Sequence, residues 1–309
     1  MATSARARAL DIMAVDRAVE EAIRAGEPGT LRVLGYGELT LVFGWPRERP
    51  EFAVKRLPPF RDVAQLDRYG DLLDRYTAAL RDRGVRVVST ELRAPEANAG
   101  EPPRAYLIQP LVPRERHLNL LLREAAPDTG AALLDTLVEY VAAVVDPEVG
   151  LDAQASNWAV EDGGLACFDL STPLMRAPDG SHGLDLSLFL SIYPWALRRA
   201  LVPVAHGVMA QYHDARIVLL DVASNLVKER LDRWLPAFLG ATAARVSPPI
   251  EEAEVRRYFA RDKKLWLLMQ WLRRADREWQ RRVRHRPYPF LLPPPYHYGP
   301  QELPESEAE

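Results

Sequence analysis

The spacing of the apolar residues differs between the parts of the chain before Pro110 and after Pro113, and this difference limits the folds open to the chain. After Pro113 most segments have apolar residues at three- and four-residue steps, which is typical of amphipathic helices. Before Pro110, one helical stretch at 62–83 is surrounded by short runs of branched and aromatic residues that read as strands. These runs are 31–34, 39–43, 51–57, 85–92 and 104–109. The sequence therefore predicts an α+β fold, with a small antiparallel sheet followed by a larger helical part.

Turn and breaker residues divide the chain into four parts. Gly26-Glu27-Pro28-Gly29 ends an amphipathic helix, and Pro110 and Pro113 interrupt regular structure between the strands and the later helices. The end of the chain is rich in proline and then acidic. We expect an N-terminal helix in 1–30, a sheet lobe at 31–112, a helical lobe at 113–286 and a Pro-rich acidic tail at 287–309.

Composition excludes several classes of protein. Hydrophobic residues make up 48% of the 309 residues and charged residues 27%, an ordinary balance for a globular chain. A net charge of −3 provides no global basic field for nucleic acid or anionic membranes. Cys167 is the only cysteine, which excludes an internal disulfide and a cysteine-based zinc site. With no signal peptide and no long apolar run, we expect a soluble cytoplasmic protein without a membrane partner.

Two acids and an amide stand close together near the middle of the chain. Asp152 precedes Asn157 by five residues, and Asp169 follows the apolar run Leu165–Phe168. Carboxylate and amide oxygens in such positions can hold a divalent cation and orient a hydroxyl group, as phosphoryl transfer requires. The alternative is an Asx-rich turn before a strand, which is common in proteins.

Two features of the predicted sheet lobe suit a phosphate ligand. Gly35 and Gly37 lie between two strands, where their backbone can approach a phosphate closely, although a plain hairpin turn explains the pair as well. Val42 stands where nucleotide loops have a branched residue under the adenine, whereas Thr40 replaces their third glycine. Lys55 lies in the next predicted strand, which is apolar. There its side chain either faces solvent or meets phosphate oxygens.

The order of these motifs resembles the protein-kinase-like superfamily, above all its small-molecule branch of aminoglycoside phosphotransferases and related kinases. The resemblance covers 31–186. The helical remainder resembles uncharacterised bacterial proteins, and this second resemblance implies no activity. It implies a two-lobed kinase-like fold that binds ATP and Mg²⁺ between the lobes. On the nucleotide side it makes Gly35 and Gly37 the phosphate loop and Lys55 a phosphate ligand. Gln109 opens the hinge segment to which the adenine hydrogen-bonds.

The same resemblance implies roles for residues of the helical lobe. Asp152 would be the catalytic aspartate that orients the acceptor hydroxyl, and Asn157 and Asp169 would be the magnesium ligands. Asp185 would brace the catalytic loop through its backbone amides.

Several positions depart from the family pattern. Gly150-Leu151 replaces the usual histidine entry to Asp152, and Leu170-Ser171 follows Asp169 in place of Phe-Gly. The helix after Lys55 has no glutamate to pair with it. The only acids inside that helix before its last turn are Asp67, Asp71 and Asp74, each one methylene shorter, and we take Asp71 and Asp74 as supporting candidates.

Other candidates for chemistry are weaker. His182, His206 and His213 do not have the spacing of a zinc site. The arginine-rich run at 273–286, with Trp271 and Trp279 nearby, favours a solvated helix face with the tryptophans packed inward over a nucleic-acid surface, and it leaves a protein partner possible.

These inferences predict an ATP- and Mg-dependent phosphotransferase that acts on a hydroxyl of a small molecule or peptide. The alternative is a catalytically degraded kinase-like protein that binds a partner as a scaffold. No motif names the acceptor.

Overall fold

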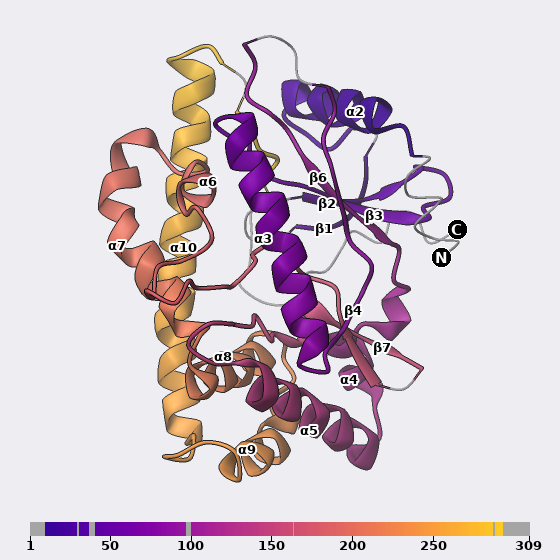
Figure 1. Ribbon diagram of the computed structural model, residues 1–309, viewed down its shortest axis with the longest axis vertical. Coiled ribbons are helices and arrows are strands. Elements are labelled where there is room, and N and C mark those ends of the chain that lie inside the picture. The colour runs from indigo at the N-terminus through magenta and orange to yellow at the C-terminus, as the bar shows by residue number, and fades with distance from the viewer. Residues whose placement is uncertain are drawn as a thin grey trace.

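The computed structural model describes residues 10–29, 31–36, 41–96, 100–162, 164–286 and 288–292. A sheet lobe lies at the upper right of Figure 1, and a larger helical lobe occupies the lower and left parts. One helix, α3 (Val63–Asp82), runs along both lobes. The two-lobed α+β fold class predicted from the sequence is confirmed.

A five-stranded sheet forms the first lobe. Its strands are β1 (Arg32–Tyr36), β2 (Leu41–Trp45), β3 (Phe52–Arg56), β5 (Glu91–Arg93) and β6 (Tyr106–Pro110). They pair in the order β1-β2-β3-β6-β5, and each neighbouring pair is antiparallel. Val42 of β2 is the register partner of Lys55 on β3, and Leu107 of β6 is its partner on the other side. This register places Lys55 in a central strand.

Helix α2 (Ile12–Ala25) packs on the sheet lobe. It begins at Asp11, whose carboxylate caps the first turn, and ends at Gly26, whose φ of 80° suits a residue without a Cβ. Val15, Val19 and Ile23 are buried and share one hydrophobic core with the strands. The predicted N-terminal helix is therefore present from residue 12 onward.

The predicted strand at 85–92 is divided between two sheets. Arg86–Val87 forms β4, which pairs in parallel with β8 (Gly164–Cys167), whereas β5 joins the five-stranded sheet. β8 also pairs antiparallel with β7 (Trp158–Glu161), so the second sheet has the order β4-β8-β7. The N–H of Val88 continues this contact by donating to the carbonyl of Cys167 at 2.9 Å. The segment after α3 therefore joins the two lobes.

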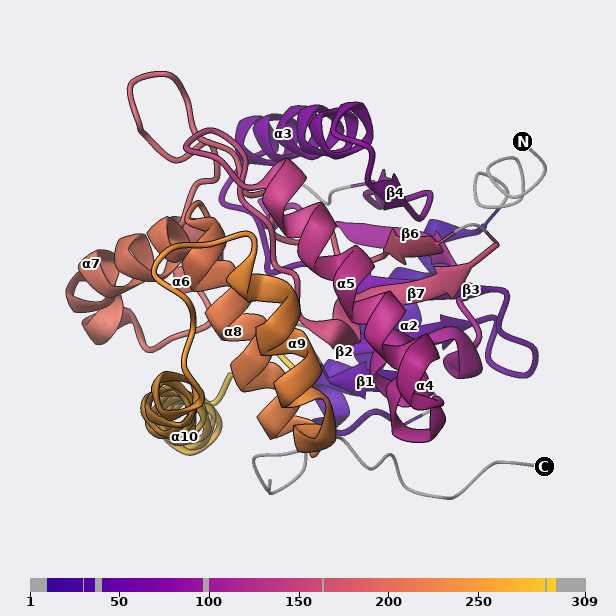
Figure 2. The ribbon, with the colours of Figure 1, turned by 90° about the horizontal axis from the view of Figure 1, so that it is seen from below.

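The helical lobe is built around α8, which buries most of its surface. Its helices are α4 (Leu118–Glu124), α5 (Pro127–Val144), α6 (Ser187–Leu190), α7 (Trp195–Gln211), α8 (Ala215–Lys228), α9 (Leu235–Ala243) and α10 (Glu252–Arg282). Helices α5, α8 and α9 pack together at the lower end of Figure 1. A Cβ on Gly130 of α5 would lie 2.1 Å from the ring of Trp234, which directly precedes α9, so that ring leaves no room for a side chain there; α5 and α9 lie side by side in Figure 2.

Two segments whose apolar residues keep helical spacing throughout, 186–201 and 217–239, are interrupted in the structure. The segment 217–239 breaks after α8, where Arg230 has a φ of 58° and the N–H of Leu231 donates to the carbonyl of Leu226 at 2.8 Å. This turn is a left-handed helix end formed without glycine. The segment 186–201 breaks before Pro194, which begins α7 because proline suits the start of a helix.

Helix α10 extends over the height of the molecule, from the helical lobe to the sheet lobe (Figure 1). At its far end the guanidinium of Arg281 lies against Gly26, the residue that ends α2. Trp271 and Trp279 are 64% and 51% exposed, so the expectation that they pack inward was wrong. Leu267 and Leu268 are exposed as well, which leaves an apolar stripe on the outer face of α10.

The first residues of the expected tail contact both lobes. The buried Tyr288 donates its hydroxyl to the carbonyl of Ile192 at 3.2 Å. Leu291 packs against the core of the sheet lobe. Residues 293–309, the rest of the expected Pro-rich acidic tail, lie outside the described part.

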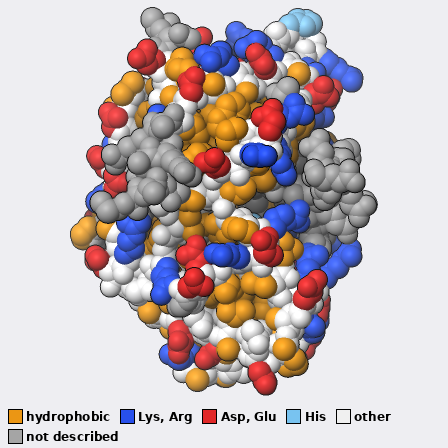
Figure 3. All heavy atoms as spheres, turned by 90° about the vertical axis from the view of Figure 1, so that its right-hand side faces the viewer, with side chains coloured by type: hydrophobic (Ala, Val, Ile, Leu, Met, Phe, Trp, Pro, Cys, Tyr) orange, Lys and Arg blue, Asp and Glu red, His pale blue; other side chains and the backbone are white. Residues whose placement is uncertain are grey.

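Charges of both signs are mixed on the face shown in Figure 3, with apolar areas between them. This face therefore carries no single-sign field, in line with the net charge of −3. Within the described residues, no helix has both the length and the apolar character to cross a bilayer.

A buried ion pair between α2 and the sheet should be important for stability. Asp16 accepts hydrogen bonds from Arg104 at 3.0 Å to each oxygen and from the hydroxyl of Tyr106 at 2.7 Å. Asp16→Ala leaves both donors without this acceptor, and we expect it to lower the unfolding free energy by about 3 kcal/mol. Chemical denaturation measures this, with Glu21→Ala at an exposed position of α2 as the control. Equal stability of the two variants would contradict the assignment.

Candidate functional site

A cavity of about 940 Å³ lies between the sheet lobe and the helical lobe. The residues predicted from the sequence that line it are Gly35, Val42, Lys55, Gln109, Asp152, Asn157 and Asp169. Gly37, the second glycine of the predicted loop, lies outside the described residues. The strands of the first sheet and the segments that flank β7 and β8 therefore contribute to one site.

Lys55 and Asp169 form a direct ion pair across the lobes. The ammonium of Lys55 donates to both Asp169 oxygens, at 2.9 Å to Oδ1 and 2.8 Å to Oδ2, and to the hydroxyl of Ser171 at 2.8 Å. The hydroxyl and N–H of Ser171 also donate to Asp169 Oδ1. Burial raises the pKa of Asp169, but the Lys55 charge and these hydrogen bonds lower it more, so the pKa lies below its usual range. Asp169 is therefore an anion at neutral pH.

Helix α3 faces this ion pair with an aromatic residue in place of an acid. The hydroxyl of Tyr69 donates to the carbonyl of Ser171 at 2.9 Å. Burial and then the charge of Asp169 raise the pKa of Tyr69, which keeps its hydroxyl protonated as a donor. Asp71 and Asp74 lie on the exposed face of α3, away from its buried stripe. Asp169, and neither of these two predicted helix acids, is the carboxylate that pairs with Lys55.

The loop that carries Asp152 is held through its backbone. Tyr76 of α3 donates its hydroxyl to the carbonyl of Gly150 at 3.0 Å, and the N–H of Leu151 donates to the carbonyl of Tyr212 at 3.2 Å. A Cβ on Gly150 would lie 2.8 Å from that Tyr212 oxygen. Gly150 therefore allows the end of α7 to approach the loop.

Asp152 and Asn157 lie at the two ends of one short turn. The side-chain amide of Asn157 donates to the backbone carbonyl of Asp152 at 3.3 Å, and the N–H of Gln154 donates to the Asp152 carboxylate at 3.4 Å. The N–H of Phe168 donates to the carbonyl of Asn157 at 3.0 Å, which connects this turn to the residue before Asp169. The predicted acid, amide and acid thus come from adjacent backbone segments.

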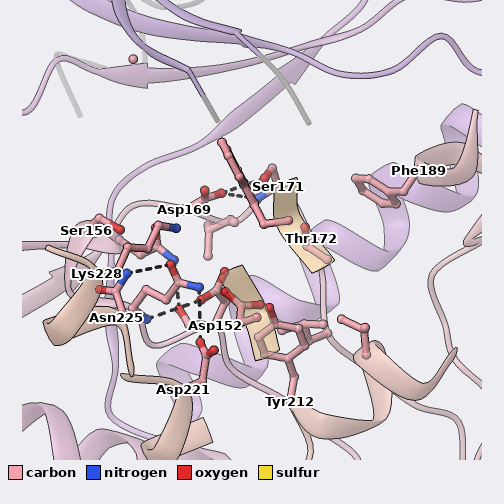
Figure 4. A pocket seen from close by; sticks show the side chains of 18 of the residues that line it. Asp152, Ser156, Asp169, Ser171, Thr172, Phe189, Tyr212, Asp221, Asn225 and Lys228 are labelled. Carbon is pink, nitrogen blue, oxygen red and sulfur yellow. Dashed lines mark hydrogen bonds between the residues drawn. The ribbon is translucent and has the colours of Figure 1, made fainter. Parts of the chain in front are cut away.

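A polar cluster beside Asp152 was not predicted. Gln154 donates to Asp221 of α8 at 3.3 Å and accepts from Asn225 at 3.2 Å, and Lys228 also lines the cavity. Figure 4 shows Asp152, Asp221, Asn225 and Lys228 grouped on one side of the pocket. The α8 members are spaced by four and three residues, so the sequence carries a signal for one helix face. We call Gln154, Asp221, Asn225 and Lys228 the α8 polar cluster.

Asp185 has partners other than those expected. Its carboxylate accepts from Gln65 of α3 at 2.7 Å and from the N–H of Ser187 at 3.0 Å, and Arg61 lies 4.0 Å away. Partial burial raises the pKa of Asp185, but the hydrogen bonds from Ser187 and Gln65 lower it more. Asp185 thus connects α3 to the start of α6, while Tyr76 and Tyr212 hold the loop that carries Asp152. That Asp185 braces this loop stays a prediction.

The upper part of the cavity is an apolar slot in the sheet lobe. Val42, Ala53 and Leu107 line it from three neighbouring strands, and Gly35 lies at its edge. Gln109 lies at the far end of β6, where its side chain donates to the hydroxyl of Thr90 and to the carbonyl of Phe168. The side chain of Gln109 therefore fixes the hinge strand against the helical lobe, while the backbone beyond it lines the cavity.

His182, His206 and His213 lie together. The ring of His182 is 5.3 Å from that of His206 and 6.2 Å from that of His213, measured between centroids. Burial and the charge of Arg176 lower the pKa of His213 to about 4, so it is neutral at pH 7. Among the described residues, no group of three or more His, Cys, Asp or Glu side chains is arranged to hold a metal ion.

The donors near Asp169 have the chemistry that magnesium prefers. Asn157 and Asp169 both line the cavity with oxygen atoms, and magnesium is commonly bound by one or two such protein ligands together with waters and phosphates. The Asp169 carboxylate is shared with Lys55, so a cation there would have to compete with the ammonium group.

Sequence comparison identifies the family. A model of a family of unknown function, DUF6206, matches residues 14–277. The chain belongs to this family. No protein with a curated description matches it.

Among solved structures, "WaaP in complex with acyl carrier protein" is similar at 14% identity, with a TM-score of 0.39 over 80% of this chain and 91% of that chain. A TM-score this low carries no argument about activity. DUF6206 is described as a family of unknown function, so membership of it assigns no activity.

The Lys55–Asp169 ion pair should make stability depend on pH. Because the pKa of Asp169 is lower in the folded state than in the unfolded state, its contribution is complete above the unfolded-state pKa. It should be lost as the pH falls through the folded-state pKa. We expect wild type and Asp169→Asn to differ most near about pH 7, and to differ progressively less as the pH falls below the unfolded-state pKa of about 4, in denaturant titrations. A difference that is constant with pH would contradict this origin.

Proposed function

We propose that this chain is a kinase-like phosphotransferase that moves the γ-phosphoryl group of ATP to an alcohol hydroxyl. The observation that carries the proposal is the Lys55–Asp169 ion pair, which joins a sheet lysine to a carboxylate 114 residues later. Asp152 and Asn157 line the same cavity. A lysine, an amide and two acids around one cleft are the groups that phosphoryl transfer needs.

The nucleotide would bind on the sheet side of the cavity. The apolar slot of Val42, Ala53 and Leu107 suits a flat aromatic base. Lys55 is the cross-strand partner of Val42, which lines the slot. Its ammonium would therefore lie beside the base and could bind the phosphate oxygens. Asn157 and Asp169 would hold Mg²⁺, which neutralises phosphate charge when bound.

Asp152 would act on the acceptor. Asp152 lines the same cavity as Asp169. Burial is the main cause that raises the pKa of Tyr76, and the charges of these two carboxylates raise it further. In the transfer, the bond between the acceptor oxygen and the γ-phosphorus forms while the bond from that phosphorus to the ADP oxygen breaks. Asp152 would orient the hydroxyl and accept its proton. Catalysis then depends mainly on positioning and charge, so each of these groups should matter strongly.

One observation favours a second function, a kinase-like protein that binds nucleotide or a partner without catalysis. Both oxygens of Asp169 are engaged by Lys55, and the face of α3 near the pair presents Tyr69 instead of an acid. Among the described residues no other carboxylate pairs with Lys55, so a cation and the ammonium would share Asp169. Such sharing would weaken metal binding and turnover while leaving the cleft intact.

Thermal-shift measurements with ATP, alone and with magnesium, separate the two functions. A phosphotransferase should show a rise in melting temperature that requires the metal, together with ADP release, and a ligand at about 100 times its Kd adds about 2.7 kcal/mol. Asp169→Asn should remove the metal-dependent part and reduce turnover by at least about a hundredfold. Asp71→Ala, at an exposed acid of α3, is the matched control.

The results have distinct meanings. Unchanged nucleotide binding and turnover in Asp169→Asn would refute the proposed site. Binding without turnover in the wild type would support the second function.

A further inference from the structure

The cavity continues past Asp152 into the helical lobe, where the nucleotide groups discussed above do not reach. This extension lies between α7, α8 and α10. Its apolar wall includes Phe189, Val204, Val208, Met209, Leu265 and Met269. We call this part of the cavity the α7–α10 groove. Because it opens directly onto Asp152, an acceptor whose hydroxyl lies at that carboxylate would extend into it.

Helix α7 shows that much of this apolar wall lies outside the fully buried core. Its 17 residues are predominantly apolar, yet none of them is buried. Val204 remains 46% exposed and Leu265 on the facing helix 39% exposed. Apolar surface left open to water costs about 25 cal/mol per Å², and contiguous open patches commonly mark binding grooves. The α7–α10 groove is thus an apolar binding surface within the active-site cavity.

The end of the groove nearest Asp152 is polar. The α8 polar cluster lies there, with hydrogen bonds from Gln154 to Asp221 and from Asn225 to Gln154. Figure 4 shows Asp221, Asn225 and Lys228 turned toward the pocket beside Asp152. A ligand that fits this arrangement has a polar end that bears a hydroxyl group, and an apolar chain at its other end.

We propose that the acceptor is an amphiphilic alcohol, whose hydroxyl group meets Asp152 and whose apolar chain lies in the α7–α10 groove. The role as acceptor rests on the proposed phosphotransferase function, whereas binding in the groove does not. The α8 polar cluster binds the head of the molecule, and the side chains of α7 and α10 bind its chain.

Monoacylglycerols of increasing chain length test the groove directly. Their binding is measured by calorimetry below the micelle concentration, with chains of about six to about twelve carbons. Each buried methylene should increase the affinity about three- to fourfold until the groove is filled. Affinity that does not change with chain length would overturn the proposal, including the case in which the groove binds a partner helix.

Two pairs of matched variants locate the bound chain. Leu265→Glu places a carboxylate in the groove, whereas Leu267→Glu makes the same change two residues away, at a position 43% exposed that does not line the cavity. Val204→Glu and Val202→Glu form a second pair on α7, because Val202, at 38% exposure, does not line the cavity. The first member of each pair should lose at least about tenfold in affinity and the second should retain it. Circular dichroism checks that the variants remain folded.

The outcomes separate this inference from the proposed function. Equal losses within both pairs, or a loss only in Leu267→Glu, would place the chain outside the groove and overturn the inference. The same preparations are tested for ATP binding with magnesium. Chain-length-dependent binding without an ATP response supports the groove and refutes the phosphotransferase. An ATP response with no dependence on chain length refutes the groove while the proposed nucleotide site stands.

Discussion

The contact between Lys55 and Asp169 is the interaction on which the site depends, because it is where the two lobes bring opposite charges together. Lys55 belongs to the central strands of the first sheet, and Asp169 directly follows the second sheet. Neither side chain is fully buried, so the ion pair remains accessible from the cavity. A buried ion pair would be a structural element only, whereas an accessible one can exchange its partners for a ligand.

Helix α3 holds this arrangement through neutral hydroxyl and amide groups. Tyr69 binds the backbone beside Asp169, Tyr76 binds the backbone before Asp152, and Gln65 binds Asp185. These donors lie on the same buried face of one helix. The positions of both acidic loops therefore depend on the rotation of α3 about its axis, and a small change in that rotation would alter the distance between the two carboxylates.

The residues that line the cavity near the ion pair could be predicted, and the residues that hold them could not. Lys55, Asp152, Asn157 and Asp169 were predicted from their residue types and their order along the chain, and all four line one cavity. Tyr69 has no such order, because its role depends on which face of α3 turns inward. The left-handed turn at Arg230 was missed for a related reason, since arginine gives no local sign of that conformation. Packing between distant segments decides such details.

The segment that holds Tyr288 and Leu291 has a mechanical consequence. Tyr288 hydrogen-bonds to the backbone between α6 and α7, and Leu291 packs against the core that α2 shares with the first sheet, so a few residues connect the lobes. This connection adds to the segment after α3 and to α10, and it restricts how far the lobes can separate. Wide separation of the lobes would require Tyr288 or Leu291 to detach from its contacts first. The rate of that detachment would limit how quickly large molecules enter or leave the cavity.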